Sequence, residues 1–255
     1  MVLNFNNLTN QLNKVNVKEN FIIIHSDLHK HQFIAKNLDI FWQTLLKCLG
    51  KNKTYIIPTF TTNFVKFKFW DYYKSKSQTG IFSEYFRKNI ADIRSIHPIH
   101  SVAIWGKKKN DVPKHKSKSS FGKGSVWEWI CESKNVCNLS IGISVNGGAT
   151  ILHYPEELNK VGYRYYKKIK GKIVLKNGKN LKKEFFYFAR KKYKKKIVVN
   201  NWSKCENDLI KNKILHKLNF NNLVICKMNT YKVTNFINKM IKNNENYLVN
   251  YKDIS

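Results

Sequence analysis

The stretch Phe-Ile-Ile-Ile-His-Ser-Asp-Leu, residues 21–28, decides how this chain begins to fold. Its first four residues are apolar and mostly β-branched, which is typical of a buried strand, and polar groups follow at the carboxyl end. Residues 38–49 then carry apolar side chains at helical spacing up to Gly50, and residues 55–58 (YIIP) resume as a strand. This strand, helix, strand unit predicts an α/β fold, in which ligands bind beyond the carboxyl ends of the strands.

The segments that follow continue this style as far as about residue 162. Residues 59–80 are polar and aromatic without a clear period, so we expect a long functional loop, and Ser83 is expected to cap a helix over 83–89. The pattern then predicts a strand over 102–105, a capped helix over 125–132, a strand over 136–143 and a helix that begins near Ala149. A strand over 223–227 and a helix over 230–241 close the chain.

Residues 163–199 have a different texture, with short aromatic and β-branched runs. Lys170-Gly171-Lys172 and Asn177-Gly178-Lys179 are both hairpin signals. The sequence therefore predicts a single domain over 1–255 with a β-rich insertion at about 163–200. The expected fold is α/β, with a central mixed, largely parallel sheet flanked by helices and an antiparallel β excursion in the C-terminal half.

The chain is strongly basic, with 47 Lys and Arg against 16 Asp and Glu and a formal net charge of +31. Such a charge favours an anionic partner, such as nucleic acid or a phosphorylated ligand. Lys and Asn are scattered along the whole chain, however, so a compositional bias toward these two residues explains much of the positive charge. Residues 185–193 interleave aromatic residues with lysine, which keeps a nucleic-acid-binding protein as the alternative of a different class, although no recognised binding motif supports it.

Segments that would direct the chain to a membrane or an oxidising compartment are not evident. No run of about eighteen apolar residues occurs, and no basic stretch precedes an apolar one at the N-terminus. The five cysteines lack CxxC spacing, which indicates reduced thiols rather than a metal site. We expect a soluble cytoplasmic protein without metal or membrane contact; its oligomeric state stays open.

Four ordered blocks carry the chemistry: residues 77–87 (SQTGIFSEYFR), 94–101 (RSIHPIHS), 120–125 (SFGKGS) and 146–156 (NGGATILHYPE). In order and spacing they resemble the aminoglycoside 3-N-acetyltransferase family, which has Arg-Ser-x-His-Pro-x-His-Ser, Phe-Gly-x-Gly-Ser and Thr-x-x-His-x-x-Glu blocks. Residues 25–28 and 57–61 also resemble that family's opening strands. The resemblance covers roughly residues 20–166.

The resemblance implies an enzyme with an acetyl-CoA donor, or another short acyl-CoA, and an amine acceptor. It assigns the catalytic base to His153, with Glu156 as its carboxylate and Thr150 in the same site. A histidine that titrates near neutrality suits this task, because a sugar ammonium must lose a proton before it can attack a thioester. Pro155 disturbs a regular helix, so Glu157 is the alternative carboxylate.

Residues at strand ends and at one helix start are the expected contacts of CoA. Backbone amides at a helix N-terminus can bind phosphate, whereas a tight turn with a Ser cap is the structural alternative for Gly-x-Gly-Ser. Within the family pattern, the expected donor contacts are His25, Ser26, Asp27, Leu28, Ser101, Phe121, Gly122, Gly124 and Ser125.

The acceptor is predicted from charge. Aminoglycosides carry several positive charges, and a basic protein repels them at long range while it attracts an anion. A nucleotide-linked amino sugar of glycan biosynthesis is therefore the preferred acceptor, with aminoglycoside antibiotic acetylation, and hence antibiotic resistance, as the second hypothesis. The second hypothesis needs an acidic pocket, for which Asp71, Glu84 and Glu157 are the candidates.

Overall fold

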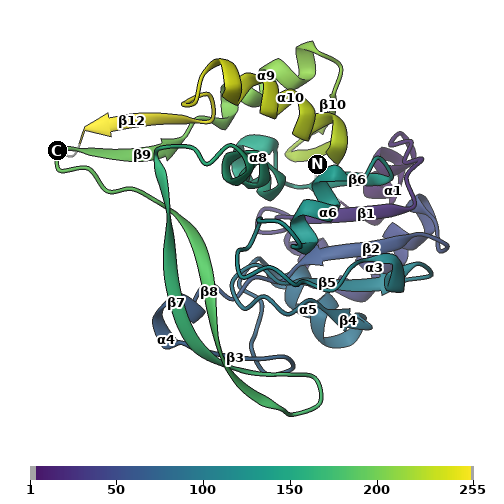
Figure 1. Ribbon diagram of the computed structural model, residues 1–255. Helices are drawn as coiled ribbons and strands as arrows, with labels where there is room; N and C mark the ends of the chain where they lie inside the picture. Colours follow the sequence, from purple (N-terminus) through teal and green to yellow (C-terminus); the bar gives the residue numbers. More distant parts are fainter. Residues whose placement is uncertain (1–3, 254–255) are drawn as a thin grey trace.

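The computed structural model describes residues 4–253, which form a seven-stranded mixed sheet, helices on both of its faces and two smaller sheets (Figure 1). The strand order of the large sheet is β10-β11-β6-β1-β2-β5-β4. Only β1 with β2 and β1 with β6 pair in parallel among these strands. The strands are β1 (Phe21–Ser26), β2 (Thr54–Pro58), β4 (Ile93–Arg94), β5 (Val102–Gly106), β6 (Val136–Ile141), β10 (Leu215–Phe220) and β11 (Leu223–Asn229).

Alternation along β1 divides the apolar core into two layers, because successive strand side chains point to opposite faces. Ile22 and Ile24 belong to the cluster that includes helices α1, α3 and α5, whereas Phe21 and Ile23 belong to the cluster that includes α6, α8, α9 and α10. The helices are α1 (Phe5–Asn13), α2 (Gln32–Ala35), α3 (Leu38–Leu49), α4 (Phe64–Phe67), α5 (Ile81–Asn89), α6 (Val126–Glu132), α7 (Val145–Gly148), η2 (Thr150–Leu152), α8 (His153–Leu158), α9 (Trp202–Lys211) and α10 (Thr230–Asn243). This arrangement confirms the α/β class with a mixed sheet, although parallel pairing is confined to its three central strands.

The C-terminal half contains the expected antiparallel excursion. Strands β7 (Arg164–Val174) and β8 (Asn180–Arg190) pair along eleven residues, and β3 (Phe69–Asp71) joins β7 in parallel. Figure 1 shows this hairpin reaching away from α9 and α10 towards α4 and β3. A separate pair joins β9 (Lys196–Asn200) to β12 (Val249–Asp253).

Only one of the two hairpin signals is a turn. Gly178 has a φ of +78° and lies in the turn between β7 and β8. Gly171 instead lies within β7 opposite Lys183, where a Cβ would be 2.5 Å from Phe64 Cζ and 2.6 Å from the Lys68 carbonyl oxygen. Glycine is needed at 171 for this close approach rather than for a turn.

Other expectations need correction. Residues 59–80 contain α4 and β3 rather than one irregular loop, because Phe64 and Trp70 are fully buried beneath the hairpin. Helix α5 begins after Gly80, so Ser83 lies within the helix and does not cap it. Helices α1 and α9 and strand β10 form in segments for which the sequence pattern predicts no element. None of the helices within residues 4–253 is long and apolar enough to cross a membrane.

Candidate active site

Two adjoining cavities lie at the carboxyl end of β1, where its polar residues are. The larger, of about 420 Å³, is lined by Ser26, Asp27, Leu28 and His29 and by residues of α2 and of the start of α5. The smaller, of about 170 Å³, is lined by His25, Ser26, Phe60 and Thr150, among others. Both share Ser26, Thr79 and Ile143, so they form one groove that leads towards Thr150. The expected donor contacts at 25–28 thus line one groove.

His153 begins helix α8, and its imidazole is anchored by Glu156 one turn later. His153 Nδ1 lies 2.5 Å from Glu156 Oε2, while Tyr163 Oη donates to Glu156 Oε1 at 2.9 Å. Arg164 Nη2 also lies 2.9 Å from Glu156 Oε2 and 3.3 Å from His153 Nδ1. With Nδ1 held by the carboxylate, Nε2 is the ring nitrogen left for a substrate.

The protonation of this pair follows from its surroundings. Burial is the main cause that lowers the pKa of His153 below its usual range, and the Arg164 charge adds to it against the opposing effect of Glu156. Burial alone would raise the pKa of Glu156, but His153, Arg164 and Tyr163 together lower it to about 2. At neutral pH the pair is therefore an ionised carboxylate beside a neutral imidazole, which is the state that can accept a proton.

A small cavity of about 40 Å³ opens beside His153. It is lined by His100, Phe121, His153, Arg164, Tyr187 and Phe188. Phe60, which lines the groove at β1, packs against His100 with ring centroids 4.7 Å apart. The Phe60 and His100 rings thus lie between the groove and the cavity at His153.

The Gly-x-Gly-Ser block forms a capped turn at the start of α6. Ser125 Oγ accepts from the Glu128 amide at 2.9 Å and caps α6, while the Gly124 amide donates to Glu128 Oε2 at 2.7 Å. The Ser125 amide donates to the Gly122 carbonyl oxygen. The amides of Gly124 and Ser125 are thus paired within the turn, and the expected contact of Gly122, Gly124 and Ser125 with CoA stays a prediction.

Two further residues expected to contact CoA, Ser101 and Phe121, do not line the groove at β1. Ser101 is fully buried; it donates to the Thr59 carbonyl oxygen at 2.7 Å and accepts from Arg94 Nε at 3.1 Å. Phe121 packs beside His153, with ring centroids 5.6 Å apart, rather than in the groove at β1. Ser101 therefore holds strands together, and Phe121 supports the imidazole.

Each of the three candidate acids for the acceptor already has a partner within the protein. Asp71 Oδ1 accepts from two amides of the turn that follows β3, and Glu84 is bound to Arg87 and to the Ser77 amide. Glu157 is buried, accepts weakly from Tyr166 Oη at 3.4 Å, and has its pKa raised by burial. Since Glu156 is the carboxylate that meets His153, Glu157 does not take the orienting place.

Sequence reasoning missed the partners that lie beyond α8. Arg164 and Tyr163 complete the environment of Glu156 from the start of β7, and Trp202 packs on the His153 ring at 5.4 Å from α9. His100, from the block at residues 94–101, also lines the cavity at His153. Proximity in sequence could have suggested Tyr163 and Arg164 as partners of Glu156. No local pattern indicates that Trp202 packs against His153. Within the described ranges, no group of histidine, cysteine and acidic residues could hold a metal ion.

Fold and site together define a mixed α/β protein with a histidine–glutamate pair beside a strand-end groove. A model of the family described as aminoglycoside 3-N-acetyltransferase matches residues 23–242. The chain belongs to this family of acetyl-CoA-dependent N-acetyltransferases, as its motif blocks predict. No curated protein sequence matches the chain significantly.

Solved structures share the fold over nearly the whole chain. The aminoglycoside acetyltransferase AAC(3)-Xa is 15% identical, with a TM-score of 0.78 over 96% of this chain and 94% of its own. AAC-IIIb, solved with CoASH, is 14% identical with a TM-score of 0.76, covering 94% and 97%. AAC-VIa, solved with sisomicin, is 13% identical with a TM-score of 0.74, covering 95% and 98%. At these identities the likeness concerns the fold.

Proposed function

We propose that this chain transfers an acetyl group from acetyl-CoA to an amine of an amino sugar, with His153 as the general base. The observation that carries the proposal is the pair of His153 and Glu156, which leaves Nε2 unprotonated at neutral pH next to a cavity. The groove at the end of β1 is the proposed CoA site, and Thr150 lines its inner end. Its position agrees with the rule that open α/β sheets bind ligands at strand ends.

The reaction uses one proton-accepting group. The acceptor ammonium first loses one proton to solvent. The free amine nitrogen then attacks the thioester carbonyl carbon to form the C–N bond while His153 Nε2 takes a second proton from that nitrogen. When the tetrahedral adduct collapses, the C–S bond breaks and the CoA sulfur leaves with a proton that the imidazolium returns. Glu156 stays ionised throughout; it holds the ring orientation and stabilises the charged imidazolium.

Charge separates the two classes of acceptor. The residues that line the cavity at His153 include the Arg164 guanidinium and no carboxylate. Asp71 and Glu84 are engaged in local contacts, and burial disfavours the ionised form of Glu157. Because Glu156 is itself paired with Arg164, a polycation would find little acidic surface at the site, and the net charge of +31 would repel it; we therefore propose an anionic, nucleotide-linked amino sugar as the acceptor.

The second candidate is an aminoglycoside antibiotic. Family membership favours it, since the family takes its description from that activity, and the related AAC-VIa is solved with sisomicin. In this chain an aminoglycoside would rely on the buried Glu157 as the nearest carboxylate beyond Glu156.

Replacement of His153 tests the base. His153→Ala should lower kcat by about 100-fold or more, which is the usual contribution of a general base, and leave CoA binding unchanged. Release of free CoA in the presence of amino sugars measures turnover, and calorimetry with CoA measures binding. Turnover equal to that of the wild type would refute the assignment.

A further inference from the structure

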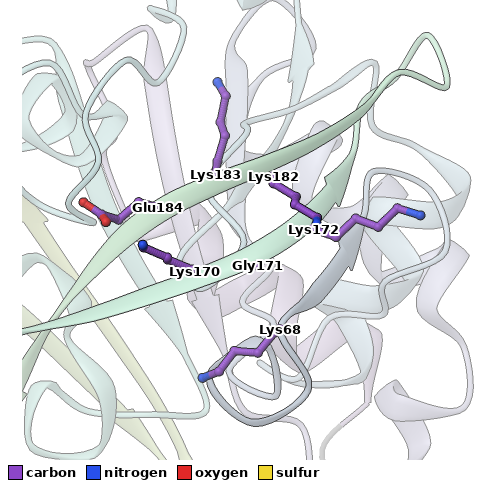
Figure 2. Close-up of a pocket in the computed structure, with 7 residues that line it drawn as sticks. All are labelled: Lys68, Lys170, Gly171, Lys172, Lys182, Lys183 and Glu184. Carbon is purple, nitrogen blue, oxygen red and sulfur yellow. The ribbon is translucent and has the colours of Figure 1, made fainter.

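A second, basic cavity lies on the β7–β8 hairpin. It has a volume of about 440 Å³ and is lined by Lys68, Lys170, Gly171, Lys172, Lys182, Lys183 and Glu184 (Figure 2). Gly171 forms part of its floor against Phe64, and the Lys172 amide donates to the Lys68 carbonyl oxygen at 2.8 Å. The lysines therefore stand on a three-stranded sheet that is fixed by buried apolar residues. We call this cavity the lysine groove.

The charge of the lysine groove is not balanced from within the protein. Its one carboxylate, Glu184, is already paired with Lys168 at 3.2 Å and Lys118 at 3.7 Å, both outside the groove. Within residues 4–253, no carboxylate forms an ion pair with any of the five groove lysines. Lys170, Lys172 and Lys182 lie on one face of the hairpin, whereas Lys183 lies opposite Gly171 on the other face. Since Lys170 is directly opposite Glu184, Lys172 and Lys182 are the two groove lysines on that face that lie opposite no carboxylate.

Two lysines that face each other across the paired strands β7 and β8 repel one another. Lys172 lies directly opposite Lys182 in the antiparallel register, and Lys170 lies two residues away on the same face of β7. Like charges at directly opposite positions destabilise a sheet, whereas an anion between them would turn that repulsion into attraction. Such an arrangement is expected of a site for a phosphate group.

The same face of the hairpin runs back to the catalytic pair. Arg164, Tyr166, Lys168 and Lys170 alternate onto one face of β7, and Arg164 contacts His153. Tyr166 is 44% exposed, and its ring packs on Phe188 at 4.8 Å. From Arg164 to Lys170 the strand rises roughly 20 Å. This length is comparable with an extended nucleoside diphosphate-linked sugar.

From this continuity we infer that the lysine groove binds the phosphate-bearing end of the acceptor while its amino sugar reaches His153. The inference rests on the proposed acetyl transfer and adds where the acceptor is recognised. Tyr166 would pack against the flat face of the sugar or base, and Lys170, Lys172 and Lys182 would neutralise the phosphates. The acceptor class is a nucleoside diphosphate-linked amino sugar.

A pair of substitutions that removes two positive charges tests the groove. Lys172→Gln with Lys182→Gln should raise the KM for UDP-glucosamine about 10-fold and leave kcat unchanged, because the lost contacts bind ground state and transition state alike. The KM for free glucosamine should not change. Lys239→Gln with Lys242→Gln, two exposed positions on α10, removes the same charge elsewhere and serves as the matched control. Equal KM values for UDP-glucosamine in both double variants and the wild type would overturn the inference.

A binding measurement separates the groove from the catalytic proposal. Inorganic pyrophosphate titrated into the His153→Ala protein should bind, and binding should weaken about 10-fold when Lys172 and Lys182 are also replaced by Gln. If no acceptor is acetylated but this difference in affinity persists, the proposed function fails while the groove stands as a phosphate site. If instead the groove substitutions abolish binding of a single-stranded oligonucleotide and do not affect pyrophosphate, the surface is a nucleic-acid site and the inference is wrong.

Discussion

At the scale of single residues, the imidazole of His153 is controlled by groups of opposite effect. Glu156 favours the protonated ring, whereas burial and the Arg164 guanidinium favour the neutral ring. The net shift of the His153 pKa is downward, so the proton-accepting form is populated at neutral pH. The buried carboxylate thus orients the imidazole without keeping it protonated.

These opposed effects predict that replacing Glu156 and replacing Arg164 will shift the pH profile of kcat/KM in opposite directions. Activity needs neutral His153, so kcat/KM should fall as the pH decreases through the folded pKa of His153, which lies below 6.5. Glu156→Gln removes a negative neighbour, which should lower that pKa further and move the acidic limb to lower pH. Arg164→Gln removes a positive neighbour and should move it to higher pH. Profiles of kcat/KM for the three proteins provide the measurement, and a shift of both variants in the same direction would contradict this account.

At the scale of elements, the junction before α6 is a cap that stabilises the fold. Ser125 Oγ accepts from the Glu128 amide in the first turn of this seven-residue helix, and Glu128 Oε2 accepts from the Gly124 amide just before it. The helix carries the fully buried Trp127. The site depends on this helix indirectly, because Trp127 donates from Nε1 to the carbonyl oxygen of His100 at 2.9 Å. The cap therefore supports the wall of the cavity at His153.

Ser125→Ala should accordingly change stability rather than donor binding. The lost cap should lower the free energy of unfolding by about 1 kcal/mol. The KM for acetyl-CoA should stay at the wild-type value, since the amides of this turn are paired within the protein. Chemical denaturation and steady-state kinetics on the same preparation check both parts. A large rise in KM for acetyl-CoA without loss of stability would restore a direct donor contact.

At the scale of the whole molecule, the excess of positive charge acts on ligands before they reach the site. With +31 in formal charge, the protein attracts anions and repels polycations over distances set by screening. The lysine groove concentrates part of this charge on the hairpin, on the face that leads to His153.

The salt dependence of catalysis should therefore reveal the acceptor's charge. With acetyl-CoA saturating, kcat/KM for UDP-glucosamine should fall as salt rises to physiological strength, where the screening length is about 8 Å. For an aminoglycoside, kcat/KM should rise with salt, because salt weakens the repulsion between the polycation and the basic protein. Both acceptors are measured at several salt concentrations. Efficient acetylation of the antibiotic at low salt, without turnover of the nucleotide-linked sugar, would refute the preferred acceptor.

Local sequence determined those parts of this protein that depend on neighbouring residues. The apolar run at 21–24, the period of 38–49 and the cap at Ser125 predict β1, α3 and α6, because burial, amphipathic spacing and capping are local properties. The spacing of His153 and Glu156 along one helical turn likewise predicts a pair that the structure contains.

Tertiary structure decided what depends on residues far apart in the chain. Tyr163 and Arg164 lie against Glu156, so Glu156 and not Glu157 is the carboxylate beside His153. Trp202 from α9 packs on the His153 ring. The tertiary structure also uses Gly171 for packing against Phe64 and not for a turn, since only the approach of α4 to β7 excludes a side chain there. Long-range contacts of this kind are set by the packing of the whole core, which local periodicity does not encode.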